Sequence, residues 1–228
     1  MNTKLFLSGG GNENDSFKID MEFITSLKHK RIIYIPLALE PTINGYESCF
    51  DWISSTFSYR LTGDFVDISM WINLQNKTLA DLNNFDAVYI GGGNTFNLLK
   101  KVKETAFDKI LINFYKNGGI IYGGSAGAII CGHDINTVKE ENEINYSKND
   151  GLNLINNYSI ICHYTKEQKN KVFSYVKENG IQVIAIPEKS GLVVEDGKKV
   201  TVVGHEPVYL FKINSTVGII GLGQEVTI

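Results

Sequence analysis

The chain has 228 residues, of which 22 are Lys or Arg and 25 are Asp or Glu, so its formal net charge is −3. This balance argues against a nucleic-acid-binding protein, which needs a clustered excess of basic residues. Hydrophobic residues make up 43% of the sequence and aromatic residues 11%, enough for a sizeable core, which excludes a disordered chain.

Nothing in the sequence resembles a membrane span or a secretion signal. Apolar runs such as residues 32–35 are far shorter than the roughly 20 residues of a spanning helix. Residues 1–7 lack the apolar core of a signal peptide. The three cysteines, an odd number without C-x-x-C spacing, are more typical of a reducing cytosol than of a disulfide framework. We therefore expect a cytoplasmic protein with no membrane contact.

Short β-rich runs alternate with helical patterns along the chain. Strands are predicted at 5–7, 31–35, 65–68, 86–90, 120–122, 158–162, 183–186 and 208–213, with a hairpin over 191–204 around Asp196-Gly197. Apolar spacing predicts helices around Phe23 and over 46–61, 107–115 and 126–131, and a capping box at Thr165 opens another. This alternation predicts βαβ units. We expect one α/β domain over 1–228, a three-layer αβα sandwich with a mainly parallel sheet.

The strongest chemical signal is the sequence G-G-S-A-G from Gly123, which directly follows a predicted strand and precedes a predicted helix. In this context G-x-S-x-G is typical of a nucleophile elbow, whose sharp turn exposes the serine hydroxyl above the sheet. The first N–H groups of the helix then point to the space where an oxyanion would form. The pattern makes Ser125 a candidate nucleophile, although an ordinary tight turn has the same residues.

A serine nucleophile needs a base, and His163 is the best placed of four histidines. His29 lies in a basic turn, His133 would lie ~12 Å along a helix from Ser125, and His205 lies in a predicted turn. His163 instead follows a strand, at the sheet edge where ligands bind in open α/β folds. The orienting acid stays open among the residues between Ser125 and His163: Asp134, Glu140, Glu141, Glu143 and Asp150.

A second glycine-rich loop, G-G-G-N from Gly91, follows the strand predicted at 86–90. It lacks both the G-x-G-x-x-G spacing of dinucleotide sites and the Gly-Lys-Ser/Thr of phosphate loops. The free N–H groups of this loop are better suited to donate a second hydrogen bond to an oxyanion. Because the histidines and acids show no ligand spacing either, we expect no metal and no cofactor.

Together, two segments resemble dipeptidase E, the family of serine peptidases that also contains cyanophycinase. They are G-G-G-N-T-F-N-L-L from Gly91 and G-S-A-G-A from Gly124, with Ser125 lying 34 residues after Gly91. Shorter similarities at Gly151-Leu152, His163-Tyr164 and Ile186-Pro187-Glu188 extend the resemblance over most of the chain. It implies a flavodoxin-like sheet related to class I glutamine amidotransferases, with serine in place of their cysteine.

The resemblance also implies roles for single residues. Ser125 corresponds to the nucleophile and His163 to the base, and the family's acid falls near Glu140, with Glu141 and Glu143 as neighbouring alternatives. Gly93 and Ala126 correspond to the oxyanion donors, and we expect Asn94 and Gly124 to contact the substrate. Position 124 is a departure, because tryptophan is common there in the family.

The implied activity is hydrolysis of short peptides through an acyl-enzyme, with a preference for an N-terminal aspartate in dipeptidase E proper. The bases considered for reading that aspartate are Lys166, Lys169 and Arg60. Alternatives are a cyanophycinase-like exopeptidase, an esterase, a catalytically silent binding protein on the same scaffold, and a cysteine nucleophile at Cys131 or Cys162. The expected partner is a small peptide, and the expected assembly a monomer or homodimer.

Overall fold

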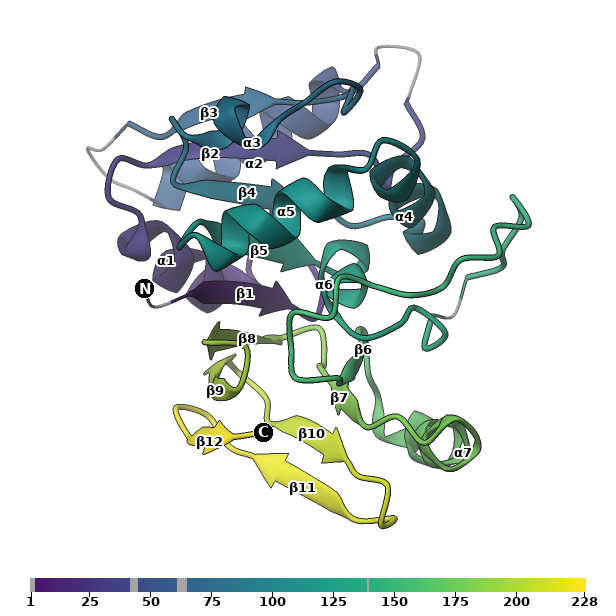
Figure 1. Cartoon of the computed structure of the whole chain (residues 1–228). Coiled ribbons are helices and arrows are strands. Elements are labelled where there is room, and N and C mark those ends of the chain that lie inside the picture. Colours follow the sequence, from purple (N-terminus) through teal and green to yellow (C-terminus); the bar gives the residue numbers. More distant parts are fainter. Residues whose placement is uncertain (1–2, 42–44, 61–64, 139) are drawn as a thin grey trace.

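The computed structural model describes residues 3–41, 45–60, 65–138 and 140–228. Its larger sheet has the strand order β12-β9-β8-β1-β5-β4-β2-β3 (Figure 1). These strands are β1 (Lys4–Ser8), β2 (Arg31–Ile35), β3 (Asp67–Met70), β4 (Ala87–Ile90), β5 (Ile120–Gly124), β8 (Ser190–Glu195), β9 (Lys199–Gly204) and β12 (Glu225–Thr227). Strands β1 to β5 pair in parallel, whereas β8, β9 and β12 extend the sheet in antiparallel pairing.

A second, smaller sheet has the order β11-β10-β7-β6. Its strands are β6 (Ser159–Ile161), β7 (Val183–Ala185), β10 (Val208–Phe211) and β11 (Val217–Ile220), and only β6 and β7 pair in parallel. The α/β class is therefore confirmed, but the expected mainly parallel sheet is found only over β1 to β5: the larger sheet as a whole is mixed, and a second sheet is present. The physical reason is that a short hairpin turn, such as the one between β8 and β9, can join only antiparallel strands.

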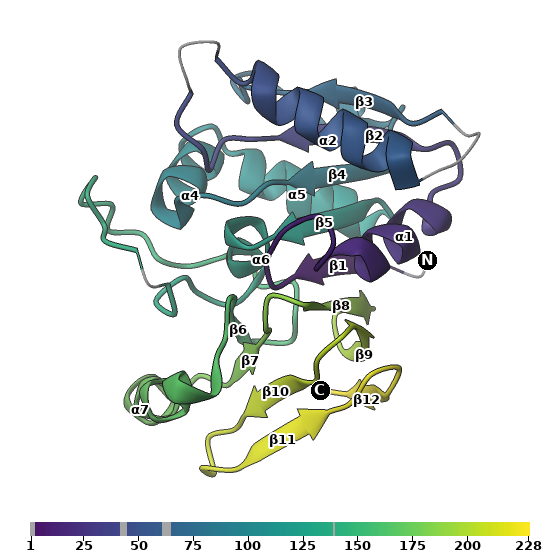
Figure 2. The same ribbon diagram turned by 180° about the vertical axis from the view of Figure 1, so that it is seen from behind.

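Helices cover both faces of the larger sheet (Figures 1 and 2). One face carries α1 (Phe17–Ser26) and α2 (Glu47–Arg60), and the other carries α3 (Leu79–Leu82), α4 (Thr95–Glu104), α5 (Phe107–Lys116) and α6 (Ala126–Cys131). The smaller sheet packs against α7 (Lys169–Asn179), which follows the 3₁₀ turn η1 (Lys166–Gln168).

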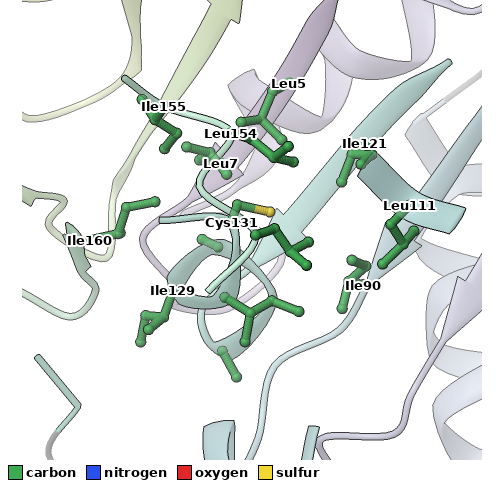
Figure 3. Close-up of a cluster of buried hydrophobic side chains, with 14 of the residues drawn as sticks. Leu5, Leu7, Ile90, Leu111, Ile121, Ile129, Cys131, Leu154, Ile155 and Ile160 are labelled. Carbon is green, nitrogen blue, oxygen red and sulfur yellow. The ribbon is translucent and has the colours of Figure 1, made fainter. Parts of the chain in front are cut away.

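Side-chain alternation along the strands creates the two cores of the larger sheet. In β1, Phe6 packs with α1 and α2, while Leu5 and Leu7 pack on the opposite face with α5 and α6. Figure 3 shows this second cluster, in which Leu111 of α5 lies near Ile90 and Ile121, and Ile129 of α6 lies on the side of Ile160. The two cores hold the carboxyl ends of the parallel strands at one edge, where the loops after β1, β4 and β5 begin.

Most predicted elements are confirmed within one or two residues at each end. The helix predicted at 46–61 is found as α2, and its last residue, Leu61, lies outside the described residues. Helix α4 was not predicted, although Asn94 carries its signal: the Asn94 side chain caps the helix by accepting a hydrogen bond from Asn97 N at 2.9 Å. Across the described ranges, no helix is both long and apolar enough to span a bilayer.

Candidate active site

Ser125 lies at the sharp turn between β5 and α6, as the G-x-S-x-G pattern predicts. Its backbone has φ 47° and ψ −107°, a strained conformation for a residue other than glycine. Small neighbours permit the turn, because a Cβ on Gly127 would lie 2.2 Å from the carbonyl oxygen of Ile90. The close approach of α6 to β4 thus presents the Ser125 hydroxyl at the carboxyl edge of the sheet.

The Ser125 hydroxyl belongs to a chain of two short hydrogen bonds. Its Oγ lies 2.8 Å from His163 Nε2, and His163 Nδ1 lies 2.8 Å from Glu188 Oε1. The histidine and glutamate side chains are 40% and 54% exposed, so a ligand can reach them from solvent. A hydroxyl, an imidazole and a carboxylate in this order can activate the serine and stabilise a charged imidazole.

The parallel pairing of β6 with β7 brings His163 and Glu188 together. Ile186 N donates to Ile161 O at 2.9 Å, and Tyr164 N donates to Ile186 O at 3.1 Å. The residues that follow both strands therefore leave the smaller sheet at the same edge. His163 N also donates to Gly9 O at 2.9 Å, which ties this edge to the loop after β1 and so to the larger sheet.

The carboxylate beside His163 Nδ1 is not the one that the sequence predicts. Within the described ranges, Glu140 makes no hydrogen bond to the imidazole: its Oε1 accepts hydrogen bonds from the Thr95 N–H, at 3.0 Å, and from the Thr95 hydroxyl. A carboxylate is stabilised there because it meets the free N–H groups and the positive dipole end of α4. Glu141 and Glu143 are exposed. The carboxylate on His163 Nδ1 belongs instead to Glu188.

Glu188 lies outside the interval between Ser125 and His163 in which the sequence analysis places the orienting acid. A signal for it was present: Glu188 follows Pro187 at the end of the strand predicted at 183–186. His163 follows the preceding predicted strand in the same way. Both residues thus follow the end of a predicted strand. This shared position brings their side chains together only because the two strands pair in parallel as neighbours.

Two backbone N–H groups near Ser125 are available for an oxyanion. Within the described ranges, neither the Gly93 N–H nor the Ala126 N–H donates a hydrogen bond to the protein. The loop after β4 passes close to the serine, since a Cβ on Gly92 would lie 3.2 Å from Ser125 Cβ. Gly93 itself has φ 135°, and a Cβ there would lie 2.4 Å from Ala38 O, so only glycine fits.

The two predicted substrate contacts have different outcomes. Gly124 lines a cavity of about 480 Å³ that opens beside Ser125 and His163. Asn94 lines neither this cavity nor a smaller one of about 130 Å³ beside Gly93 and Glu140. Its side chain caps α4, and its own N–H donates to Ala38 O at 2.7 Å, so it supports the loop rather than facing a ligand.

The cysteines are poor candidates for the nucleophile. Burial raises the pKa of Cys131 to about 12, which keeps the thiol protonated, and its Sγ donates to Gly127 O at 3.2 Å. Cys162 is also buried, with its Sγ 3.5 Å from Ser125 O. Among the described residues, no cluster of three or more His, Cys, Asp or Glu side chains is arranged to hold a metal ion.

Comparison with known proteins identifies the family. The model of peptidase family S51 matches residues 5–202 of the chain. The chain belongs to peptidase family S51. It is therefore a serine-type peptidase, a hydrolase, and the resemblance to dipeptidase E is confirmed.

Individual relatives agree with this assignment. Peptidase E of Nostoc sp. is 28% identical over 195 residues, which cover 80% of this chain and 76% of that protein. Peptidase E of Streptomyces coelicolor is 25% identical over 187 residues, 75% of each chain. The crystal structure of a peptidase from an acI-B1 actinobacterium has the same fold, with a TM-score of 0.70 at 18% identity over 100% of this chain and 98% of that one.

In this S51 peptidase, Gly10 packs directly against the imidazole of His163. One added methyl group at Gly10 should therefore have a large effect on activity. A Cβ on Gly10 would lie 2.1 Å from His163 Cε1 and 2.7 Å from Nε2. We expect Gly10→Ala to displace the imidazole and to lower kcat by about 100-fold, the cost of a misplacement of roughly 1 Å. The measurement is peptide hydrolysis, with circular dichroism to verify folding.

Gly180→Ala is the matched control for that substitution. Gly180 also has a positive φ, 66°, but a Cβ there meets nothing within 4 Å. It therefore tests an alanine at a positive-φ glycine without the clash at His163, although its φ is less extreme than the 110° of Gly10. Equal activity of the two variants would show that Gly10 does not position the histidine.

Proposed function

We propose that the protein hydrolyses short peptides through Ser125, His163 and Glu188, with a covalent acyl-enzyme intermediate. The observation that carries the proposal is the pair of 2.8 Å contacts that join Ser125 Oγ, His163 Nε2, His163 Nδ1 and Glu188 Oε1. The peptidase E relatives support a peptide substrate, and we propose its short length from the resemblance to dipeptidase E.

In the first half of the reaction, His163 Nε2 takes the proton of the Ser125 hydroxyl as Oγ attacks the peptide carbonyl carbon. The carbonyl electron pair moves to the oxygen, which the N–H groups of Gly93 and Ala126 stabilise. Glu188 accepts the Nδ1 proton in a hydrogen bond, which keeps the correct tautomer and stabilises the charged ring. His163 then protonates the leaving amine, and the C–N bond breaks.

In the second half, His163 takes a proton from a water molecule that attacks the acyl ester. The tetrahedral intermediate collapses, the peptide's carboxylate leaves, and the proton returns from His163 to Ser125 Oγ. Atoms balance as one water consumed for each peptide bond broken. Glu140 contributes indirectly in this proposal, because its contact with Thr95 holds the loop after α6 against the start of α4.

A preference for N-terminal aspartate is not part of this proposal. Among the described residues that line the cavities beside Ser125, there is no Lys or Arg. Lys169 lies over the Phe173 ring on α7, with its Nζ 5.9 Å from the ring centroid, and Lys166 lies on η1. The side chain of Arg60 is outside the described residues.

A fluorophosphonate probe tests the proposal, because it reacts with activated serines. We expect a stoichiometric adduct that peptide mass spectrometry maps to Ser125, and we expect His163→Ala to abolish it. A parallel panel of dipeptides, tripeptides and simple esters separates a peptidase from an esterase. Failure to form the adduct, with no turnover of any substrate, would favour a silent binding protein on this scaffold.

A further inference from the structure

Four aromatic side chains line the larger cavity beside Ser125, together with glycines and serines. Tyr34, Tyr89 and Tyr122 line it from the sheet, and Trp52 lines it from α2. The cavity volume of about 480 Å³ lies within the roughly 300–1,000 Å³ of small-molecule sites. The carboxylate-bearing side chain of an aspartate would leave most of this space empty.

The tyrosines hold one another in a preformed arrangement. The rings of Tyr89 and Tyr122 stack with centroids 4.4 Å apart and an interplanar angle of 11°, and Tyr34 meets Tyr89 edge-on at 5.7 Å. All three side chains are largely buried, whereas Trp52 is 42% exposed. The cavity thus combines a rigid aromatic wall with a large indole that a ligand can cover.

The charges around the cavity disfavour an anionic ligand. No Lys or Arg of the described chain lines it, and the carboxylate of Asp20 lies behind its wall. Tyr122 donates to Asp20 Oδ1 at 2.6 Å and Ser16 donates to Oδ2 at 2.8 Å, so both oxygens are engaged by groups that themselves line the cavity. A substrate carboxylate here would lose its water without gaining a cation from the described residues that line the cavity.

We propose that this cavity takes a large aromatic or aliphatic side chain of the peptide, adjacent to the bond that Ser125 cleaves. The inference rests on the proposed function, because Ser125 and His163 border the same cavity. An aromatic side chain buries about 150–250 Å² and gains further stabilisation from edge or stacked contacts with other rings. The peptidase is therefore selective for bulky neutral residues and rejects aspartate.

A dipeptide panel measures this selectivity directly. We expect kcat/KM for Phe-Ala, Tyr-Ala or Leu-Ala to exceed that for Asp-Ala by at least about 100-fold, because the charge of aspartate is buried unpaired. Comparing Phe-Ala with Ala-Phe tells on which side of the scissile bond the cavity lies. Faster cleavage of Asp-Ala, or of Lys-Ala, would overturn the inference.

Two variants test the cavity itself. Trp52→Ala is expected to raise KM for the aromatic dipeptide by about tenfold with little change in kcat, through the lost ring contact. Phe65→Ala is the matched control, since Phe65 is 84% exposed and does not line the cavity.

Ser48→Arg, at an exposed position on the cavity rim, should shift selectivity toward Asp-Ala by about tenfold. An unchanged KM in Trp52→Ala would contradict the proposal.

Binding to Ser125→Ala separates this inference from the proposed function. Calorimetry on this variant compares Phe-Ala with Asp-Ala without any turnover. Tighter binding of Phe-Ala would support the aromatic cavity even if the wild-type protein formed no fluorophosphonate adduct. An adduct at Ser125 together with tighter binding of Asp-Ala would retain the peptidase and reject the cavity assignment.

Discussion

Ser125→Ala is expected to reduce kcat for peptide hydrolysis by at least about 10⁴-fold, because the variant has no atom to form the acyl-enzyme. The residual rate would come from binding and from the Gly93 and Ala126 N–H groups. The fold should be unchanged. The Ser125 hydroxyl forms its hydrogen bond with the His163 ring, and the backbone hydrogen bonds of the turn do not involve it. Hydrolysis and thermal unfolding should be measured on the same preparation.

Ser215→Ala provides the control for the alanine substitution. Ser215 is also a serine at positive φ, 60°, but it lies exposed in the turn between β10 and β11. We expect it to retain full activity. Near-normal hydrolysis by Ser125→Ala would reject the nucleophile assignment, and a matching loss in Ser215→Ala would show that the effect is not specific to Ser125.

Glu188→Gln is the second substitution with a large expected effect. The amide keeps the size of the side chain, but it carries no charge and can present an N–H to His163 Nδ1, which favours the wrong tautomer. Loss of the corresponding carboxylate in a buried triad costs about 10⁴-fold in kcat. Because Glu188 is 54% exposed, water can compensate in part, and we expect a loss of about 10²- to 10³-fold.

Glu140→Gln is the isosteric comparison. Its amide oxygen can still accept hydrogen bonds from Thr95, so the loop stays in place and the expected loss is at most about tenfold. Steady-state kinetics of both variants on one substrate would rank the two acids. If Glu140→Gln had the larger effect, the acid would be the one that the family resemblance implied, and the contact seen at Glu188 would be secondary.

The features that could be predicted from the sequence depend on neighbours along the chain. The elbow at Ser125 needs a strand, small residues at Gly123 and Gly127, and a following helix, all within a few positions. The glycine loop at Gly93 has the same local character. Strand and helix patterns could be read in the same way, because alternation and helical spacing report which side chains are buried.

The features that the sequence left open depend on contacts between distant segments. The hairpin of β8 and β9 was predicted, but its antiparallel docking on β1, and with it the mixed sheet, was not. Likewise the second sheet forms only when β10 pairs with β7 across the chain. Local patterns indicate that a strand exists, whereas its partner and direction depend on which surfaces pack together.

The candidate site likewise has some features that depend on neighbouring residues and others that depend on distant contacts. From the sequence alone, Ser125 in its sharp turn is predicted as the nucleophile, His163 at the end of a strand as the base, and Gly93 and Ala126 as N–H donors. Which carboxylate meets His163 depends on long-range packing, because the parallel pairing of β6 and β7 brings Glu188 to it while the start of α4 attracts Glu140 to Thr95. A carboxylate is used by whichever hydrogen-bond donors the fold places within its reach, and that choice is made in space.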